Sequence, residues 1–279
     1  MSVIIDKTSS VFFSTTFTDQ NVRVSENGSK ITVNLDNPIG FPSSALYATL
    51  EISQAAVWWT SPNIGDLYNN NKFVYLINSV VQPEIVIPNG LYSLTSLNSY
   101  LSREFVNRGQ DGNLISFIGD DSTSKVVLTI GVDNVQADFD SVGSVGAIMG
   151  FSGIVPTTLE PSGTSVESQN QATFNSINSY AIKSDILSGG IPVNNSGLNI
   201  LANIPITAKI GSQINYAPTN PIRVDASELR GKRKQAFYLQ LVDQDGNNVS
   251  TAGEPWSCLI VLRYGVLLSN TSVPLLDVG

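Results

Sequence analysis

The sequence contains no histidine, and this absence limits its chemistry more than any other feature of its composition. A Ser-His-Asp or Cys-His nucleophile, a histidine-ligated zinc ion and an imidazole base all need that residue. The single cysteine, Cys258, lies in phase with Trp256, Ile260 and Leu262, which predicts a small buried side chain and not a reactive thiol. One cysteine also excludes an intrachain disulfide framework. We therefore expect a protein that is not an enzyme and needs no cofactor.

Acidic pairs are the remaining route to catalysis, because two carboxylates about 5–10 Å apart suffice for glycoside hydrolysis. The candidates Asp120/Asp121 and Asp138/Asp140 lie beside predicted turns, where solvated acids are common. The stretch V-D-Q-D-G-N-N-V at 242–249 lacks the further ligands of a calcium loop. Asp245-Gly246 predicts a hairpin turn there instead.

Charge is also scarce, with 14% charged residues and a formal net charge of -8. No overall basic field exists to attract nucleic acid or an anionic membrane. The run L-R-G-K-R-K at 229–234 is a local exception that supplies Arg230, Lys232, Arg233 and Lys234. It predicts a solvated loop, with contact to an acidic partner or to packaged nucleic acid as the alternatives.

Long apolar runs are missing too. The nearest candidate for a membrane span, W-S-C-L-I-V-L-R-Y-G-V-L-L, is interrupted by Arg263. The N-terminus M-S-V-I-I-D-K lacks the basic and apolar regions of a secretory signal. We expect a soluble chain without membrane insertion.

What the chain does contain is alternation of apolar and polar residues, which predicts half-buried strands at 31–35, 73–77 and 237–241. Turn dipeptides between such runs favour antiparallel strands. Weaker strands are predicted at 180–186, 198–204, 213–216 and 222–224. The fold class is therefore all-β.

One segment predicts a helix. Ser93 can cap it, Leu94, Leu97, Leu101 and Phe105 form its apolar stripe, and it should end near Gly109. A hairpin, a strand near 136–139 and a glycine-punctuated turn follow. Residues 83–155 thus look like a small α+β insertion between first strands in 1–82 and a long loop with the remaining strands in 156–279.

Trp58 and Trp59 stand side by side in one predicted strand, so only one of them can lie in the core. Counting from residue 46 puts Trp58 with Leu50 on the apolar face and Trp59 with Tyr47 on the other. The count predicts Trp58 in the core and Trp59 on the surface, where it suits a subunit contact. A bulge at Gln54 would exchange the two roles.

Three blocks of the sequence stand out together. The first is G-S-K-I-T-V-N-L-D-N-P-I with P-S-S-A-L-Y-A-T-L-E-I-S-Q-A-A-V-W-W-T-S-P-N-I and N-N-K-F-V-Y, the second is I-P-N-G-L-Y-S-L-T-S-L-N-S-Y-L, and the third is F-Y-L-Q-L-V-D-Q-D-G with W-S-C-L-I-V-L-R-Y. These blocks resemble penton, or minor capsid, proteins of virophages and polinton-like viruses. In I-M-G-F, Met149 stands where that group is expected to have leucine. The likeness covers about two-thirds of the chain and is thin between 156 and 230.

This resemblance implies an antiparallel jelly-roll capsid protein that forms the fivefold vertex of a small icosahedral virion as a homopentamer. Neighbouring major capsid protein capsomers would be its partners, and assembly would take place in the host cell cytoplasm. We expect Trp59, Tyr47 and Tyr68 at the subunit interface.

Three other interpretations remain open from the sequence. The first is a compact double jelly roll, the major capsid protein of a small virus. The second is a carbohydrate-binding host-attachment protein that stacks sugars on Trp59 or Tyr68. The third is the carboxylate-only glycosidase.

Overall fold

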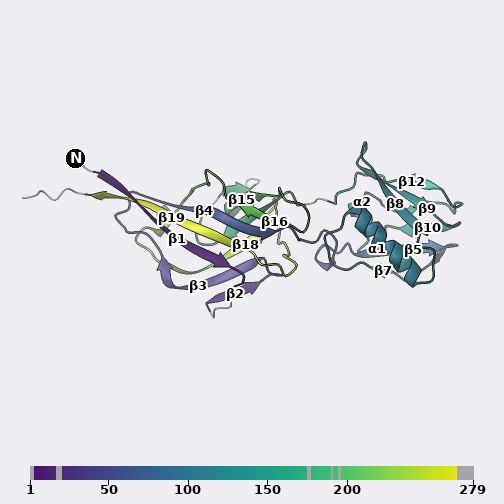
Figure 1. The fold of residues 1–279 in the computed structure, drawn as a ribbon, viewed down its shortest axis with the longest axis horizontal. Coiled ribbons are helices and arrows are strands. Elements are labelled where there is room, and N and C mark those ends of the chain that lie inside the picture. Colours follow the sequence, from purple (N-terminus) through teal and green to yellow (C-terminus); the bar gives the residue numbers. More distant parts are fainter. Residues whose placement is uncertain (1–2, 17–20, 175–176, 190, 194–195, 269–279) are drawn as a thin grey trace, which may run out of the picture. The chain divides into compact units, whose positions relative to one another are not determined.

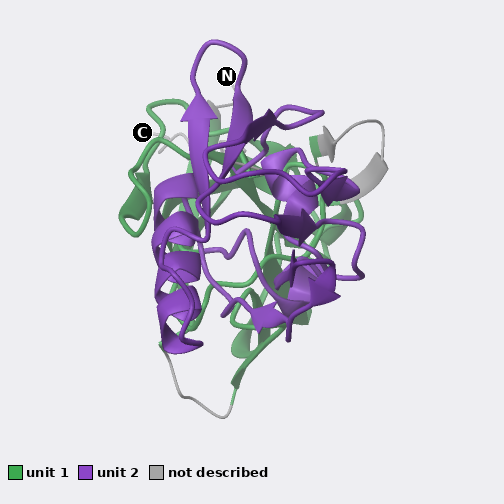
Figure 2. Cartoon of the chain, turned by 90° about the vertical axis from the view of Figure 1, so that its right-hand side faces the viewer, with its two compact units in different colours: residues 1–60, 177–279 green, residues 61–176 purple. Residues whose placement is uncertain are grey.

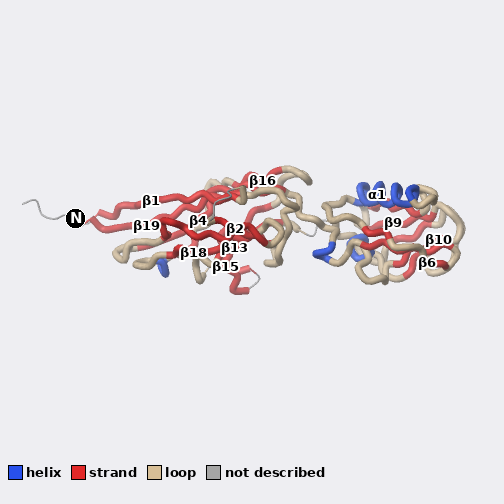
Figure 3. Tube along the Cα trace, turned by 90° about the horizontal axis from the view of Figure 1, so that it is seen from below, coloured by secondary structure: helices blue, strands red, loops and turns tan. Residues whose placement is uncertain are grey.

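The computed structural model describes residues 3–16, 21–174, 177–189, 191–193 and 196–268. The chain forms two compact units, unit 1 from residues 1–60 and 177–279 and unit 2 from residues 61–176 (Figure 2). Strands dominate the regular structure of unit 1, whereas unit 2 combines short strands with helices (Figure 3). The prediction of an all-β, antiparallel fold is confirmed.

Unit 1 contains two antiparallel sheets (Figure 1). Sheet I has the order β1-β19-β4-β16, and β17 also pairs with β4. Its strands are β1 (Val3–Ser14), β19 (Ser257–Leu268), β4 (Tyr47–Trp58), β16 (Gln213–Tyr216) and β17 (Val224–Asp225). Sheet II has the order β14-β15-β13-β18-β3-β2. Its strands are β14 (Ile191–Val193), β15 (Ser196–Pro205), β13 (Ser179–Ser184), β18 (Lys234–Val242), β3 (Lys30–Ile39) and β2 (Val22–Ser25).

The strand order of unit 1 is that of a jelly roll. The short strands β2 and β14 only extend sheet II at its edges, and β16 and β17 together make one interrupted strand beside β4. The eight strands that remain, numbered in chain order, then read 1-8-3-6 in sheet I and 2-7-4-5 in sheet II. This interleaving of early and late strands is the double Greek key of a jelly roll.

A single apolar core joins the two sheets of unit 1. Leu50 and Ile260 reach it from sheet I, and Ile31 and Leu239 reach it from sheet II. Each of these four side chains is fully buried, because alternate residues of each strand point to the same face. The sandwich is thus held by burial of apolar area, the main favourable contribution to folding.

Four connections of unit 1 meet at one end of the sandwich. Thr60 Oγ1 donates to the carbonyl of Thr251 (3.0 Å), and the Thr251 amide donates to the carbonyl of Asn27 (3.1 Å). The Trp59 amide donates to the carbonyl of Ser212 (3.0 Å). Unit 2 is inserted at this end, between β4 and β13.

Unit 2 has its own core and is not a second jelly roll. One sheet contains β11 (Ile154–Val155), β10 (Val135–Asp138), β5 (Lys72–Ile77), β6 (Val80–Val81) and β7 (Ile85–Val86). The other contains β12 (Ser165–Glu167), β9 (Lys125–Ile130) and β8 (Ile115–Asp120). Phe73 lies at the centre, with ring contacts to Tyr75, Phe105, Phe117 and Phe139. The double jelly-roll alternative is therefore wrong.

The predicted helix is confirmed as α1 (Leu94–Asn107). Ser93 caps it by accepting a hydrogen bond from the Ser96 amide (3.2 Å), and Leu97, Leu101 and Phe105 are buried. Unit 2 also contains α2 (Gly146–Met149) and the short helix η1 (Asp66–Tyr68), and unit 1 contains η2 (Ser227–Leu229). No helix within the described ranges is long and apolar enough to cross a membrane.

The inserted unit is wider than the predicted 83–155. Residues 61–82 were expected among the first jelly-roll strands, yet β5 pairs with β10, β6 and β7 inside unit 2. Residues 156–176 were expected in a long loop, yet β12 pairs with β9. A period of two indicates a strand but carries no information on which sheet it joins.

Candidate functional site

Asp120, Asp243 and Cys258, which the sequence offered as candidates for chemistry, each have a local structural setting. Asp120 accepts hydrogen bonds from the Ser122 amide (2.9 Å) and hydroxyl (2.5 Å), which lower the pKa of its carboxyl. Asp243 closes the 242–249 turn by accepting from the Asn247 amide (2.8 Å). Burial raises the pKa of the Cys258 thiol to about 12. No group of three or more acidic or cysteine side chains is placed to hold a metal ion among these residues.

The basic run lies between η2 and β18, and its first arginine is structural. Arg230 donates from Nη1 to the carbonyl of Ala45 (3.1 Å) and from Nε to the carbonyl of Ser227 (3.3 Å). It thereby ties the loop before β18 to the loop before β4. Arg230 thus has a structural role, and its contact with a partner stays a prediction.

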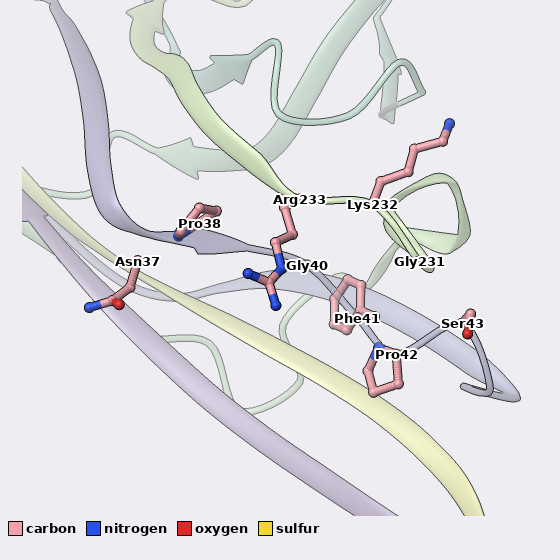
Figure 4. Close-up of a pocket in the computed structure, with 9 residues that line it drawn as sticks. All are labelled: Asn37, Pro38, Gly40, Phe41, Pro42, Ser43, Gly231, Lys232 and Arg233. Carbon is pink, nitrogen blue, oxygen red and sulfur yellow. The ribbon is translucent and has the colours of Figure 1, made fainter.

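Lys232 and Arg233 instead line an open pocket of about 560 Å³ (Figure 4). The Arg233 guanidinium lies beside Phe41 at the pocket, whereas the Lys232 ammonium points away from it (Figure 4). Neither cation forms an ion pair with any residue that the structure describes. The loop is exposed, as predicted, and its contact with an acidic partner or with nucleic acid stays a prediction.

Local backbone irregularity makes this pocket. Lys234 pairs with Ile39, but Ala236, two residues later, pairs with Asn34, so residues 35–38 of β3 bulge away from β18. Gly40 lies so close to the next segment that a Cβ on it would meet the Lys232 carbonyl oxygen at 2.1 Å. Only glycine fits at this position. The loop with Gly40 and the loop with Lys232 can therefore lie together and form the rim of the pocket.

The predicted faces of Trp58 and Trp59 are wrong. β19 pairs Leu259 with Gln54 but Ile260 with Ile52, so Ser53 is an extra residue in β4. This β-bulge reverses the alternation after it. Trp59 consequently lies against the core of unit 1 with most of its ring covered, while Trp58 points to the outer face of sheet I. The prediction that Trp59 lies on the surface is therefore wrong. The alternative prediction, in which a bulge near Gln54 exchanges the faces of the two tryptophans, is correct.

Tyr47 and Tyr68 are both partly exposed, but they belong to different units. Tyr47, the first residue of β4, lies across Gly265 and donates its hydroxyl proton to Asp6 Oδ1 (2.5 Å). That hydrogen bond raises the pKa of the Tyr47 phenol. Tyr68 ends η1 in unit 2. An interface role for Tyr47 and Tyr68 stays a prediction.

A buried carboxylate on the outer face of sheet I was not foreseen. The side chain of Glu51 is only 2% exposed, although Leu50 and Ile52 beside it face the core. Glu51 Oε1 accepts from Arg263 Nη2 (2.9 Å) and Nε (3.0 Å), and Oε2 accepts from Arg223 Nε (3.2 Å). Two arginines thus surround one carboxylate, and the register places Asp6 and Asp225 on the same face, so its charge is mixed.

The same outer face also exposes apolar side chains. Residues that pair across strands share a face, which places Tyr47 beside Gly265 and Leu267 beside Ile4. Ile4 is 55% exposed and Leu267 51% exposed. Arginine and tyrosine among exposed aliphatic side chains is the composition of a protein contact surface. We call this set, with Arg223 and Arg263, the sheet I patch.

Comparison with known proteins finds similarity at the level of structure. No protein-family model matches the chain, and no curated protein matches it. Among solved structures, the chain is similar to the crystal structure of the mavirus penton protein, with a TM-score of 0.39 and 10% sequence identity. The match covers 95% of this chain and 100% of that one.

Proposed function

We propose that this chain is a structural protein of a viral capsid, which forms the fivefold vertex of an icosahedral virion as a homopentamer. The observation that carries the proposal is the 1-8-3-6 and 2-7-4-5 strand order of unit 1. Jelly rolls with this topology occur mainly in viral capsid proteins, lectins and cupins.

The other jelly-roll classes fit these residues less well. A cupin-type metal site is usually rich in histidine, which the sequence lacks. A lectin role was predicted to use Trp59 or Tyr68 as a sugar-stacking platform. The Trp59 ring lies against the core, and the use of Tyr68 in unit 2 stays a prediction. A capsid role needs neither a metal nor a stacking platform, and it needs surfaces that bind other subunits.

The sheet I patch is the surface that we assign to the contact between neighbouring subunits of the ring. The contact is heterologous, because a cyclic pentamer joins two different surfaces of each copy. An acidic side chain of the adjacent copy would pair with Arg223, whose side chain is 61% exposed and makes one hydrogen bond to Glu51. The neighbouring major capsomers would then surround the ring in the virion.

The test is the mass and symmetry of the purified full-length protein, by light scattering and negative-stain microscopy, alone and with the major capsid protein of its virus. A fivefold ring is expected. Arg223→Glu should weaken the ring, while Arg263 still holds Glu51. Lys183→Glu, the same charge change on β13 of sheet II, is the matched control. A strict monomer that also fails to enter particles would refute the proposal.

A further inference from the structure

One sheet edge of unit 1 differs from the other three. Sheet II ends in β2 and β14, of four and three residues, and β14 contains Pro192. The far edge of sheet I is split into β16 and β17, with Pro218 and Pro221 between them. Short strands and prolines are the usual protection of an edge against pairing with another chain. The fourth edge, β1, has twelve residues and neither proline nor glycine.

The backbone groups of β1 that face away from β19 belong to even-numbered residues. The Thr15 amide donates to the Trp256 carbonyl (3.0 Å), directly beyond the last pair Ser14↔Ser257. Because hydrogen-bonded and non-bonded pairs alternate in an antiparallel ladder, odd residues of β1 bond to β19. The amide and carbonyl groups of Ile4, Asp6, Thr8 and Ser10 therefore point away from the sheet.

The residues of β1 form a palindrome of apolar and polar character about Thr8. Two apolar residues, Ile4 and Ile5, begin it, and two apolar residues, Val11 and Phe12, end it. Between them stand Asp6-Lys7 on one side of Thr8 and Ser9-Ser10 on the other. Two copies of such a strand can pair antiparallel so that apolar residues face apolar residues and polar residues face polar residues.

A twofold axis through Thr8 makes every pair favourable. Ile4 then faces Phe12 of the second copy, and Ile5 faces Val11, which are apolar cross-strand pairs. Asp6 faces Ser10, and Lys7 faces Ser9, which can hydrogen-bond.

Neighbouring registers fail this comparison. Moving the axis by one residue toward the N-terminus sets Lys7 against Lys7 of the second copy, and like charges directly opposite are unfavourable. Moving it by one residue toward the C-terminus sets Asp6 against Phe12. Of these three registers, only the one centred on Thr8 matches both faces of the strand.

A partly apolar cavity lies at the same edge. It has a volume of about 150 Å³. Its apolar lining includes Val11 and Phe13 of β1 and Val22, Val33 and Leu35 on the side of sheet II, and its polar lining is Ser14, Asn21, Asn34 and Asp36. In the register centred on Thr8, Ile5 of the second copy lies beside Val11. An added strand would thus cover apolar surface that the short β2 leaves open.

We infer that β1 is a twofold docking edge, on which β1 of a second copy adds antiparallel to sheet I with Thr8 on the axis. The contact has its own symmetry and uses the backbone edge of sheet I. It shares the side chain of Ile4 with the sheet I patch, but the pairing at Thr8 is tested separately from the fivefold contact proposed above.

A disulfide between two cysteines at the axis would show the register of the two β1 strands directly, whatever larger assembly the protein forms. In Thr8→Cys, the two Cα atoms would lie about 5.5 Å apart, within the range of a disulfide. In the control Ser10→Cys, the two cysteines would be four residues out of register, about 13 Å apart. Mild oxidation of the full chain should give covalent dimers on a denaturing gel for Thr8→Cys alone.

A proline at the same position tests the hydrogen bonds. The Thr8 amide points out of the sheet, so Thr8→Pro removes no bond to β19 and should leave the subunit folded. It removes two intermolecular bonds by symmetry, and we expect at least about tenfold weaker twofold association. Thr8→Val, which keeps the amide, should associate like the parent chain.

Equal oxidation of Thr8→Cys and Ser10→Cys, or no covalent dimer from either, would overturn the inference. So would association of folded Thr8→Pro that is as strong as that of Thr8→Val. A fivefold ring with no Thr8→Cys dimer would leave the proposed function intact and refute this contact alone.

Discussion

The two adjacent tryptophans give the sharpest test of the bulge in β4. Trp59→Ala removes a ring that lies against the apolar core of unit 1, whereas Trp58→Ala removes a ring on the outer face of sheet I. A fully buried tryptophan replaced by alanine costs about 3–5 kcal/mol, as transfer free energy plus a cavity term. Because Trp59 is not fully buried, we expect its replacement to lower the free energy of unfolding by about 2–4 kcal/mol.

Trp58→Ala is the matched control, because the side chain, the strand and the size of the change are the same. Solvent can fill the space left on an outer face, so no enclosed cavity forms and the cost should stay near 1 kcal/mol. At about 2–4 °C per kcal/mol for a unit of this size, Trp59→Ala should lower the Tm of unit 1 by about 5–15 °C and Trp58→Ala by only a few degrees.

Thermal unfolding followed by circular dichroism, with intrinsic fluorescence to report the tryptophan environment, measures both variants. If Trp58→Ala lowers the Tm as much as Trp59→Ala or more, the bulge at Ser53 does not set the faces and the reasoning fails.

The other predictions concern the thiol, the helix cap and the buried carboxylate. Burial raises the pKa of the Cys258 thiol to about 12, so this thiol should not react with a maleimide in the folded protein from pH 7 to 9. It should react at once in denaturant. Labelling of the folded protein that rises with pH, as for a free thiol, would contradict this prediction. Ser93→Ala should lower the free energy of unfolding of unit 2 by about 1 kcal/mol, through loss of the helix cap, with Ser99→Ala as a mid-helix control. Arg263→Met should lower the free energy of unfolding of unit 1 by about 2–3 kcal/mol in chemical denaturation, because Glu51 then keeps only Arg223. Arg223→Met should cost less than half as much, since Arg263 donates two hydrogen bonds to Glu51. Equal costs would show that the two bonds from Arg263 are not dominant.

Local features of this fold could be predicted from the sequence, and features that depend on distant pairing could not. The helix α1 was predictable because its cap and apolar stripe lie within 14 residues. The extra residue Ser53 was not, because no glycine or proline marks it and the bulge is defined against β19. The partners of Glu51 lie 172 and 212 residues away along the chain. Alternation placed Glu51 on the outer face of its strand, but only the folded sheet shows which arginines cover it.

The pairing of β1 with β19 has a consequence for the order in which a ribosome-bound chain can fold. Residues 3–14 find their partners only at residues 257–268, so sheet I cannot close before nearly the whole chain is made. At about 5–20 residues per second, β1 waits on the order of 10–50 s with both of its edges open. Unit 2 is continuous in sequence and complete by residue 176, so it can fold during that time. During synthesis, unit 2 can thus be folded while unit 1 is still incomplete. Chaperones that bind exposed strands would then bind β1 first.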